Sequence, residues 1–229
     1  MYGVLCSGEG CSGVMPLRGV PFAVETVPEG WFFPRRWRRS QKRLRSRGVR
    51  TVLVQPGLPA LTPGWGLHTM EVLPLLMALA PLQVSACQRK LGLFPSETTL
   101  AVAGERLTPE VWQLLFRLSA QARYLELYFP RGAEAAAQRL CYHCGASAVA
   151  GVDAGKSRAQ IFLSLSPGTS PEKAAVVTLS PAENGLLRQA VLPSDWDIPP
   201  WNRLCLTELY AALWAAGALS LQEIPLQWT

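Results

Sequence analysis

The feature that most constrains the fold is an alternation of short apolar runs with amphipathic helical patterns between Thr98 and Gly168. Apolar runs bounded by turn residues are typical of strands that are buried on both faces of a parallel sheet. Strands that alternate with helices of about 10–15 residues indicate right-handed βαβ units. We therefore predict an α/β fold with a mostly parallel, doubly wound sheet and helices on both faces. The elements read, in order, TTLAVAG, a helix over Pro109–Gln121, RYLELYF, a helix over Ala133–Cys144, ASAVAG and AQIFLSLSP.

The N-terminal part of the chain predicts a second group of elements. Residues 1–33 are rich in Gly and Pro and are expected to hold one or two short strands. Residues 34–48 predict a helix, because Pro suits a first helical turn and Gly suits the C-terminal cap. A strand, VRTVLVQP, follows, and a long helix is expected over Met70–Leu91.

The C-terminal part predicts an extension of the sheet domain. After Pro171, two apolar runs flank Asn184-Gly185, a pair that favours a β-hairpin. A final helix is expected over LTELYAALWAAGAL. We expect two domains: an N-terminal α/β segment over residues 1–95, and a Rossmann-like domain with a C-terminal hairpin and helix over residues 96–229.

The positive charge of the chain is concentrated in one segment. The net charge is +6, and it would fall to −3 without nine basic residues that lie within 16 positions. On the predicted helix, Trp37 and Leu44 lie seven residues apart, so a narrow apolar stripe faces the protein and the other faces are cationic. We predict that this helix binds nucleic acid or another polyanion, with a steep salt dependence. The alternative is a solvated outer helix whose arginine stems cover apolar surface. The nine residues are Arg35, Arg36, Arg38, Arg39, Lys42, Arg43, Arg45, Arg47 and Arg50.

Neither hydropathy nor cysteine content indicates a membrane or secreted protein. The most apolar run, Val72–Cys87, has 16 residues, whereas a membrane span needs roughly 20. No N-terminal stretch has the order of a secretory signal. Six cysteines in such a chain indicate reduced thiols. We expect no transmembrane segment and a cytoplasmic location.

In the order and length of its elements, the stretch Thr98–Gly168 resembles the cofactor-binding half of the shikimate dehydrogenase type of Rossmann domain. The resemblance implies an NAD(P)-linked oxidoreductase relative, with NADP as the first cofactor to test. It places Arg131, after the second strand, where such proteins hold the 2′-phosphate of NADP. The cofactor-binding residues that it implies are Gly104, Arg106, Thr108, Arg131 and Ser166.

The phosphate-binding turn departs from the G-x-G-x-x-G pattern of these domains. Arg106 takes the place of the second glycine and Pro109 that of the third. Thr108, Pro109 and Glu110 instead form a typical helix start, in which the helix is capped by its own side chains. This departure favours a Rossmann-like scaffold that holds no dinucleotide.

Two further glycine-rich stretches match nucleotide motifs without the required context. GEGCSG, over Gly8–Gly13, is not followed by a helix, because Pro16, Gly19 and Pro21 come next. AGVDAGKS, over Ala150–Ser157, is close to a P-loop, but a strand rather than a helix is expected after Lys156. We interpret both as loops.

The cysteines and the remaining candidate groups assemble no catalytic set. Cys141 and Cys144 have metal-ligand spacing, and Cys6 and Cys11 could supply the second ligand pair of a zinc site at a looser spacing. Because a helix C-terminus disfavours thiolates, we expect instead buried or half-buried thiols that fill the core. Cys87 and Cys205 are also expected in the core. Asp195 and Asp197 lie in a loop whose tryptophans are expected to anchor it. We find no G-x-S-x-G motif and assign no catalytic residue.

Two functions of different kinds follow from the sequence. The first is a non-catalytic, Rossmann-like protein that acts by binding a partner through its basic helix. The second is the NAD(P)-binding oxidoreductase relative. The missing glycines and the basic helix favour the first, and whether the protein is an enzyme stays open at this point.

Overall fold

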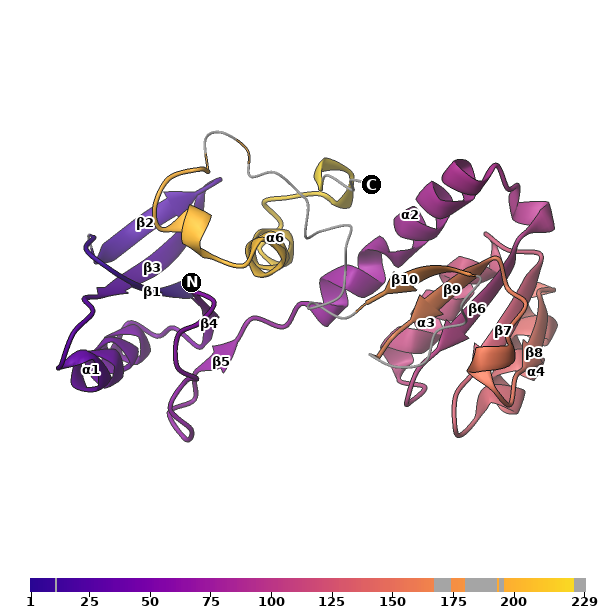
Figure 1. Cartoon of the computed structure of the whole chain (residues 1–229), viewed down its shortest axis with the longest axis horizontal. Coiled ribbons are helices and arrows are strands. Elements are labelled where there is room, and N and C mark those ends of the chain that lie inside the picture. Colours follow the sequence, from indigo (N-terminus) through magenta and orange to yellow (C-terminus); the bar gives the residue numbers. More distant parts are fainter. Residues whose placement is uncertain (11, 167–173, 180–192, 194–195, 225–229) are drawn as a thin grey trace. The chain divides into compact units, whose positions relative to one another are not determined.

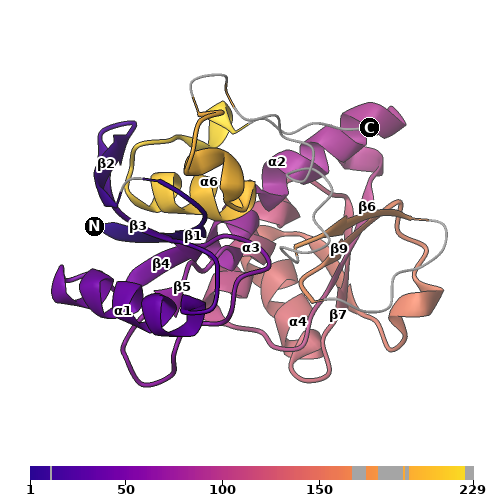
Figure 2. The ribbon, with the colours of Figure 1, turned by 60° about the vertical axis from the view of Figure 1, so that its left-hand side comes forward.

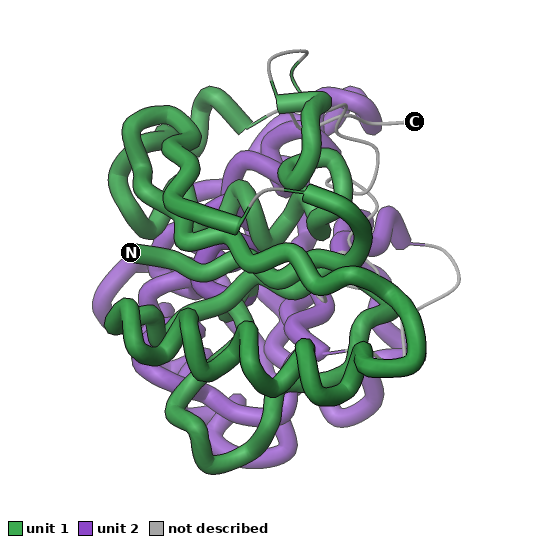
Figure 3. Tube along the Cα trace, turned by 90° about the vertical axis from the view of Figure 1, so that its left-hand side faces the viewer, with its two compact units in different colours: residues 1–72, 186–229 green, residues 73–185 purple. Residues whose placement is uncertain are grey.

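The computed structural model describes residues 1–10, 12–166, 174–179, 193 and 196–224 (Figure 1). The chain forms two compact units, shown in different colours in Figure 3. Unit 1 consists of residues 1–72 together with 186–229, and unit 2 of residues 73–185. The boundary expected from the sequence lies between residues 95 and 96. In the structure the long helix belongs to unit 2 and the C-terminal helix to unit 1.

Unit 2 contains a five-stranded sheet in which every strand pair is parallel. The spatial order is β10-β9-β6-β7-β8. Numbered along the chain this is the order 3-2-1-4-5 of doubly wound Rossmann sheets, read from the other edge. The predicted α/β class and the mostly parallel sheet are thus confirmed. The strands are β6 (Thr99–Ala103), β7 (Tyr124–Tyr128), β8 (Ser147–Ala150), β9 (Ile161–Ser164) and β10 (Ala175–Thr178).

Strand β10 comes from the first apolar run of the expected hairpin. Ala175 pairs with Ile161 and Thr178 with Ser164, so this run extends the parallel sheet. The turn at Asn184-Gly185 and the second run lie outside the described residues.

Helices and one connecting segment cover the two faces of this sheet. Helices α3 (Pro109–Ser119) and α4 (Ala133–Cys144) follow β6 and β7 in the same direction across the sheet, so right-handed crossovers place both on one face. Helix α2 (Leu73–Leu91) lies beside α3. On the other face, Ala101 and Phe162 pack with Ala159 of the segment that joins β8 to β9, which includes the short 3-10 helix η2 (Ala154–Lys156).

Unit 1 contains a second five-stranded sheet, in the order β2-β3-β1-β4-β5. Strand β1 pairs in parallel with both β3 and β4, and β2 is antiparallel to β3. Figure 2 shows α1 on one side of these strands and α6 on the other. The elements are β1 (Tyr2–Ser7), β2 (Gly13–Leu17), β3 (Val20–Val27), α1 (Phe33–Ser46), β4 (Thr51–Val54), β5 (His68–Thr69) and α6 (Leu206–Ala215).

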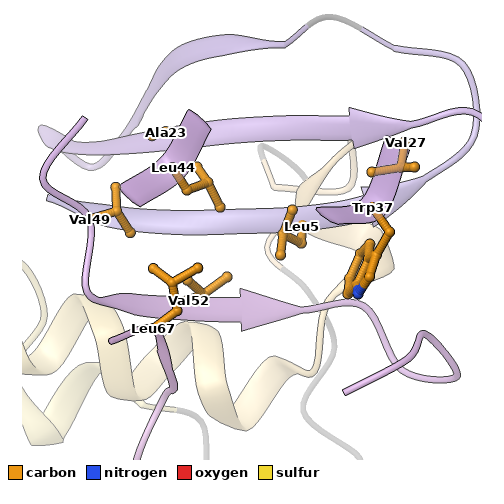
Figure 4. Packing of buried hydrophobic residues seen from close by; sticks show 8 residues of the cluster. All are labelled: Leu5, Ala23, Val27, Trp37, Leu44, Val49, Val52 and Leu67. Atoms are coloured by element: carbon orange, nitrogen blue, oxygen red, sulfur yellow. The ribbon is translucent and has the colours of Figure 1, made fainter. Parts of the chain in front are cut away.

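The apolar stripe of α1 forms part of the core of unit 1. Trp37 lies near Val27 and Leu5, and Leu44 near Ala23 (Figure 4). Ser40 and Gln41, on the same side of the helix, are also buried. The expected narrow stripe is confirmed, and it leaves the rest of the helix surface to polar and charged side chains.

The C-terminal stretch of unit 1 is anchored by aromatic side chains. Trp201 packs edge-on against Phe22 with ring centroids 5.2 Å apart, and Trp196 lies 5.7 Å from Tyr210. Both tryptophans are buried, as expected for anchors of this loop. Within the described residues, no helix combines the length and the hydropathy that a membrane crossing would require.

Candidate anion-binding sites

The turn between β6 and α3 forms the helix start that the sequence predicts. The Thr108 hydroxyl accepts a hydrogen bond from the Val111 amide at 3.4 Å, and Pro109 is the first helical residue. The hydrogen bond with Thr108 lowers the pKa of the Glu110 carboxyl below its usual value. The positive end of this helix is therefore occupied by the side chains of its own first turn.

Gly104 is required here by packing between the strands. A Cβ at this position would lie 2.9 Å from Cε1 of Phe129 and 3.2 Å from Cδ1 of Leu165. Phe129 follows β7 and Leu165 follows β9, so side chains that follow both neighbouring strands press against the glycine. The retained glycine thus has a structural reason that does not involve a cofactor.

The turn between β7 and α4 leaves its helix end uncapped by side chains. Gly132 takes the N-cap position with φ near +82°, a conformation that favours glycine, and provides no side-chain cap. The amide groups of the first turn of α4 are donors that an anion would satisfy, and the helix dipole favours negative charge at this end.

A hollow of about 670 Å³ opens beside this uncapped helix end. Arg106 and Arg131 both line it, together with Arg139 from α4. Trp112 forms part of the wall, and its ring centroid lies 5.8 Å from the guanidinium carbon of Arg139. Among the described residues, no carboxylate lies within ion-pair distance of these three arginines. We call this the arginine hollow.

Sequence reasoning missed Arg139, although a signal for it exists. Ala135 and Arg139 are four residues apart in α4 and therefore lie on one side of the helix. Since Ala135 is in the first turn, just after Arg131, Arg139 projects towards the same hollow. The helical spacing from Arg131 onwards would have identified it.

A second hollow of about 540 Å³ lies next to the first and shares Glu105 and Pro130 with it. It lies over the carboxyl ends of the central strands, where open α/β sheets bind their ligands. Two of the implied cofactor residues, Gly104 and Ser166, line it. Thr108 lines neither hollow, and its hydroxyl caps α3.

Tyr128 forms one wall of this second hollow and is held in place by a small polar network. Its hydroxyl donates to Oε2 of Glu126 at 2.8 Å, and the Ser157 hydroxyl donates to the same oxygen at 2.6 Å. Burial and the bond to Glu126 raise the pKa of Tyr128 above its usual value. A Cβ at Gly151 would clash with the Tyr128 ring. The ring therefore lies directly on the glycine backbone.

In unit 1, all nine residues of the basic segment are exposed, but two of them have a structural role. Arg43 and Arg47 form ion pairs with Glu25 at 3.5 and 3.2 Å. The side chain of Glu25, in the middle of β3, is only 1% exposed. The two arginines thus neutralise a buried carboxylate of their own unit.

Five of the other basic residues form one continuous strip on α1. At about 100° per residue they fall within roughly 120° of one another, opposite Trp37 and Leu44. The α1 sequence, Phe33–Ser46, contains no acidic residue. The Nζ atom of Lys42 lies 5.7 Å from the Trp65 ring. We call this set the basic stripe; its members are Arg35, Arg38, Arg39, Lys42 and Arg45.

Two exposed aromatic residues precede the basic stripe, and they are not among the site residues expected from the sequence. Trp31 is 93% exposed and Phe32 is 55% exposed. By contrast, the next residue, Phe33, stacks on Trp37 with ring centroids 5.8 Å apart. The sequence does contain a signal for this exposure: a tryptophan that follows Gly30 and lies outside the helical apolar pattern.

The two glycine-rich stretches have the loop contexts expected from the sequence. After β1, residues 8–12 lead into strand β2, although Cys11 lies outside the described residues. Residues after Lys156 lead into β9 rather than a helix. Lys156 itself pairs with Asp153 at 3.6 Å on the surface. Neither stretch forms a loop before a helix N-terminus, which phosphate-binding motifs require.

The cysteine expectations are partly wrong. Cys87 is buried, and burial raises the pKa of its thiol to about 12. Cys205 is partly exposed. Cys141 and Cys144 are exposed rather than buried, because they lie in the last turn of α4, beyond Leu140, the last buried residue of this helix. The Cys141 sulfur accepts a hydrogen bond from the Ala148 amide at 3.5 Å. No cluster of three metal-ligating side chains occurs among the described residues.

Comparisons with known proteins found distant structural likenesses. No family model and no curated protein matches the chain. L-tryptophan dehydrogenase from Nostoc punctiforme is 12% identical, with 73% of this chain and 56% of that chain covered and a TM-score of 0.35. Shikimate 5-dehydrogenase from Listeria monocytogenes is 10% identical, with 72% of this chain and 68% of that chain covered and a TM-score of 0.29. Ornithine transcarbamoylase from Giardia lamblia is 9% identical, with 93% of this chain and 84% of that chain covered and a TM-score of 0.35.

The chain thus spans just over half the length of the tryptophan dehydrogenase. Likenesses this distant do not bear on function. The Rossmann-like classification of unit 2 rests on its parallel strands and their order.

Proposed function

We propose that the protein acts by binding a nucleic acid through the basic stripe of unit 1. The observation that carries this proposal is the division of α1 into two faces. Its apolar residues are buried in the core of unit 1. Its outward face presents five cations, and the helix contains no acidic residue. Among the described residues, Glu25 pairs with Arg43 and Arg47, which lie on another side of the helix.

The chemistry of the stripe suits a chain of phosphates. Each cation that replaces a condensed counterion contributes to affinity, and the logarithm of the affinity falls by about 0.7 to 0.9 per contact for each tenfold rise in salt. Five contacts therefore predict a slope of roughly −3.5 to −4.5. Between 50 and 200 mM salt, the affinity should fall by about 100-fold or more.

The test compares two variants with equal net charge. Replacing the five stripe residues by glutamine should weaken binding to a labelled oligonucleotide by at least ~30-fold at 50 mM salt and flatten the salt slope. The matched control removes five exposed cations from unit 2 instead: Arg89, Arg117, Arg123, Lys156 and Arg158. Both variants have a net charge of +1. Fluorescence anisotropy across a salt series measures the affinities.

The control should retain an affinity within about threefold of the wild type at this moderate salt. Equal losses in both variants would mean that only net charge matters, and the stripe would have no special role. Absence of binding by the wild-type protein at 50 mM salt would also contradict the proposal.

A second candidate function is the binding of a phosphorylated nucleotide, with NADP as the first ligand to test. Three arginines without a carboxylate partner among the described residues surround one hollow at the carboxyl end of the parallel sheet. The helix end beside it, at Gly132, has no side-chain cap, whereas the end of α3 is capped by Thr108. An anionic group would therefore bind at the β7–α4 turn rather than at the β6–α3 turn.

Thermal unfolding with about 1 mM NADP, NAD or ATP tests this second function. A dissociation constant of ~10 μM would add about 2.7 kcal/mol, which raises the melting temperature by roughly 5–10 °C. We expect the rise with NADP to disappear in Arg131→Gln and in Arg139→Gln, and to persist in Arg158→Gln, which removes an exposed charge away from the hollow. A rise that all three variants retain would exclude the arginine hollow as the site.

A further inference from the structure

We infer that the nucleic acid bound by the basic stripe is single-stranded, and that Trp31 and Phe32 stack on its bases. This inference rests on the proposed polyanion-binding function of the stripe and specifies its ligand. Its basis is the position of two exposed aromatic rings directly before a helix whose outward face is cationic.

The exposure of Trp31 has no explanation in the packing of unit 1. Large aromatic side chains are buried on average, since they contribute strongly to the cores of proteins. Phe33, the next aromatic residue, turns inward and stacks on Trp37. The rings of Trp31 and Phe32 make no ring contact with any other described residue. They are thus free to contact a ligand.

The backbone presents these two rings in a fixed turn. The Phe33 amide donates to the Gly30 carbonyl at 2.9 Å, and Gly30 has φ near +124°. The Arg36 amide donates to the Phe32 carbonyl at 3.1 Å, which joins the turn to the first turn of α1. Aromatic rings held on a closed turn lose little conformational freedom when a ligand binds.

The order of the groups suits a strand with splayed bases. Arg35 begins the basic stripe four residues after Trp31, and the stripe ends at Arg45, about 15 Å further along the helix. A single strand can place its bases on the rings and its phosphates along the stripe. Aromatic stacking of this kind contributes a factor of about 5 to 100 per base. In a duplex the faces of the bases are already stacked on one another and are not available.

A lipid surface fits the same charges less well. Helices that lie in a membrane interface insert a free apolar face below the headgroups. The apolar face of α1, with Trp37 and Leu44, is buried in unit 1. Only the two rings at the start of the helix would be left to insert.

The experiment measures the binding of three probes by the full chain. The probes are a 5′-labelled 12-nucleotide single strand of mixed sequence, its duplex, and vesicles with ~30% phosphatidylserine. The variants are Trp31→Ala, Trp31→Phe and, as a matched control, Tyr142→Ala, which removes an 86% exposed ring from unit 2. Each is titrated at several salt concentrations.

We expect Trp31→Ala to weaken single-strand binding by roughly 5- to 100-fold without changing the salt slope, because the ring carries no charge. Trp31→Phe should recover much of the loss, and Tyr142→Ala should bind as the wild type does. Duplex binding should not respond to Trp31. Because Trp31 is almost fully exposed, these variants should fold like the wild type.

Three results would overturn the inference. If Trp31→Ala binds the single strand and the duplex as the wild type does while the stripe variant loses both, the stripe binds polyanions without stacking. If neither nucleic acid binds, or the stripe variant is unaffected, the proposed function itself fails. If vesicles bind in a Trp31-dependent manner and oligonucleotides do not, the surface contacts lipid instead.

Discussion

Replacing Trp37 by alanine is expected to lower the free energy of unfolding by about 3–5 kcal/mol. The side chain is 4% exposed, lies in the cluster with Leu5 and Val27, and stacks on Phe33. Its indole nitrogen also donates to the Ala60 carbonyl at 3.5 Å. Truncation leaves a cavity between α1 and the sheet and removes this bond. Chemical denaturation followed by circular dichroism measures the change, and the melting temperature should fall by roughly 10 °C.

Trp31→Ala provides the matched control for this prediction. It removes the same side chain six positions earlier, where the ring is 93% exposed. Surface substitutions of this kind usually change stability by less than about 0.5 kcal/mol. If the two alanine variants were equally stable, α1 could not be attached to unit 1 through its apolar stripe.

The double substitution Arg43→Gln and Arg47→Gln is expected to cost about 3 kcal/mol of stability. It leaves the carboxylate of Glu25 buried in β3 without either of its ion-pair partners. A buried charge without a partner is strongly unfavourable, whereas the loss of an exposed charge is nearly neutral. Denaturant unfolding at neutral pH measures the difference.

A second double substitution, Arg35→Gln and Arg38→Gln, removes the same charge from the basic stripe and should leave stability within about 0.5 kcal/mol of the wild type. Adding Glu25→Gln to the Arg43 and Arg47 variant should recover most of its loss, because no buried charge then remains. An equally large loss in the Glu25→Gln background would show that the arginines act through packing rather than through the carboxylate.

Local patterns predicted most of unit 2. The apolar runs of β6, β7 and β9 and the capping residues of α3 depend on neighbours within a few positions, and the sequence shows them directly. The partner of β10 is set by tertiary structure. Its first residue, Ala175, pairs with Ile161 of β9, a partner that no local sequence pattern indicates. The local turn signal at Asn184-Gly185 suggested a hairpin instead.

In the candidate sites too, some residues are indicated by their position along the chain and others only by the tertiary structure. Arg106 and Arg131 were predicted because the family resemblance gives their positions along the chain. Arg139 lines the same hollow because of the helical geometry of α4. The exposure of Trp31 depends on which of the neighbouring aromatic side chains packs into the core of unit 1. The ion pairs of Arg43 and Arg47 depend on a carboxylate about 20 residues earlier in the chain, which charge counting along the helix does not identify.

The discontinuity of unit 1 has a consequence for synthesis on the ribosome. All of residues 73–185 are translated between the two parts of this unit. Unit 2 therefore has its complete sequence while the first sheet still lacks Trp201, which packs against Phe22. At about 5–20 residues per second this interval lasts on the order of ten seconds. During it the Phe22 ring has no Trp201 to cover it, so unit 2 can complete its fold before unit 1 can.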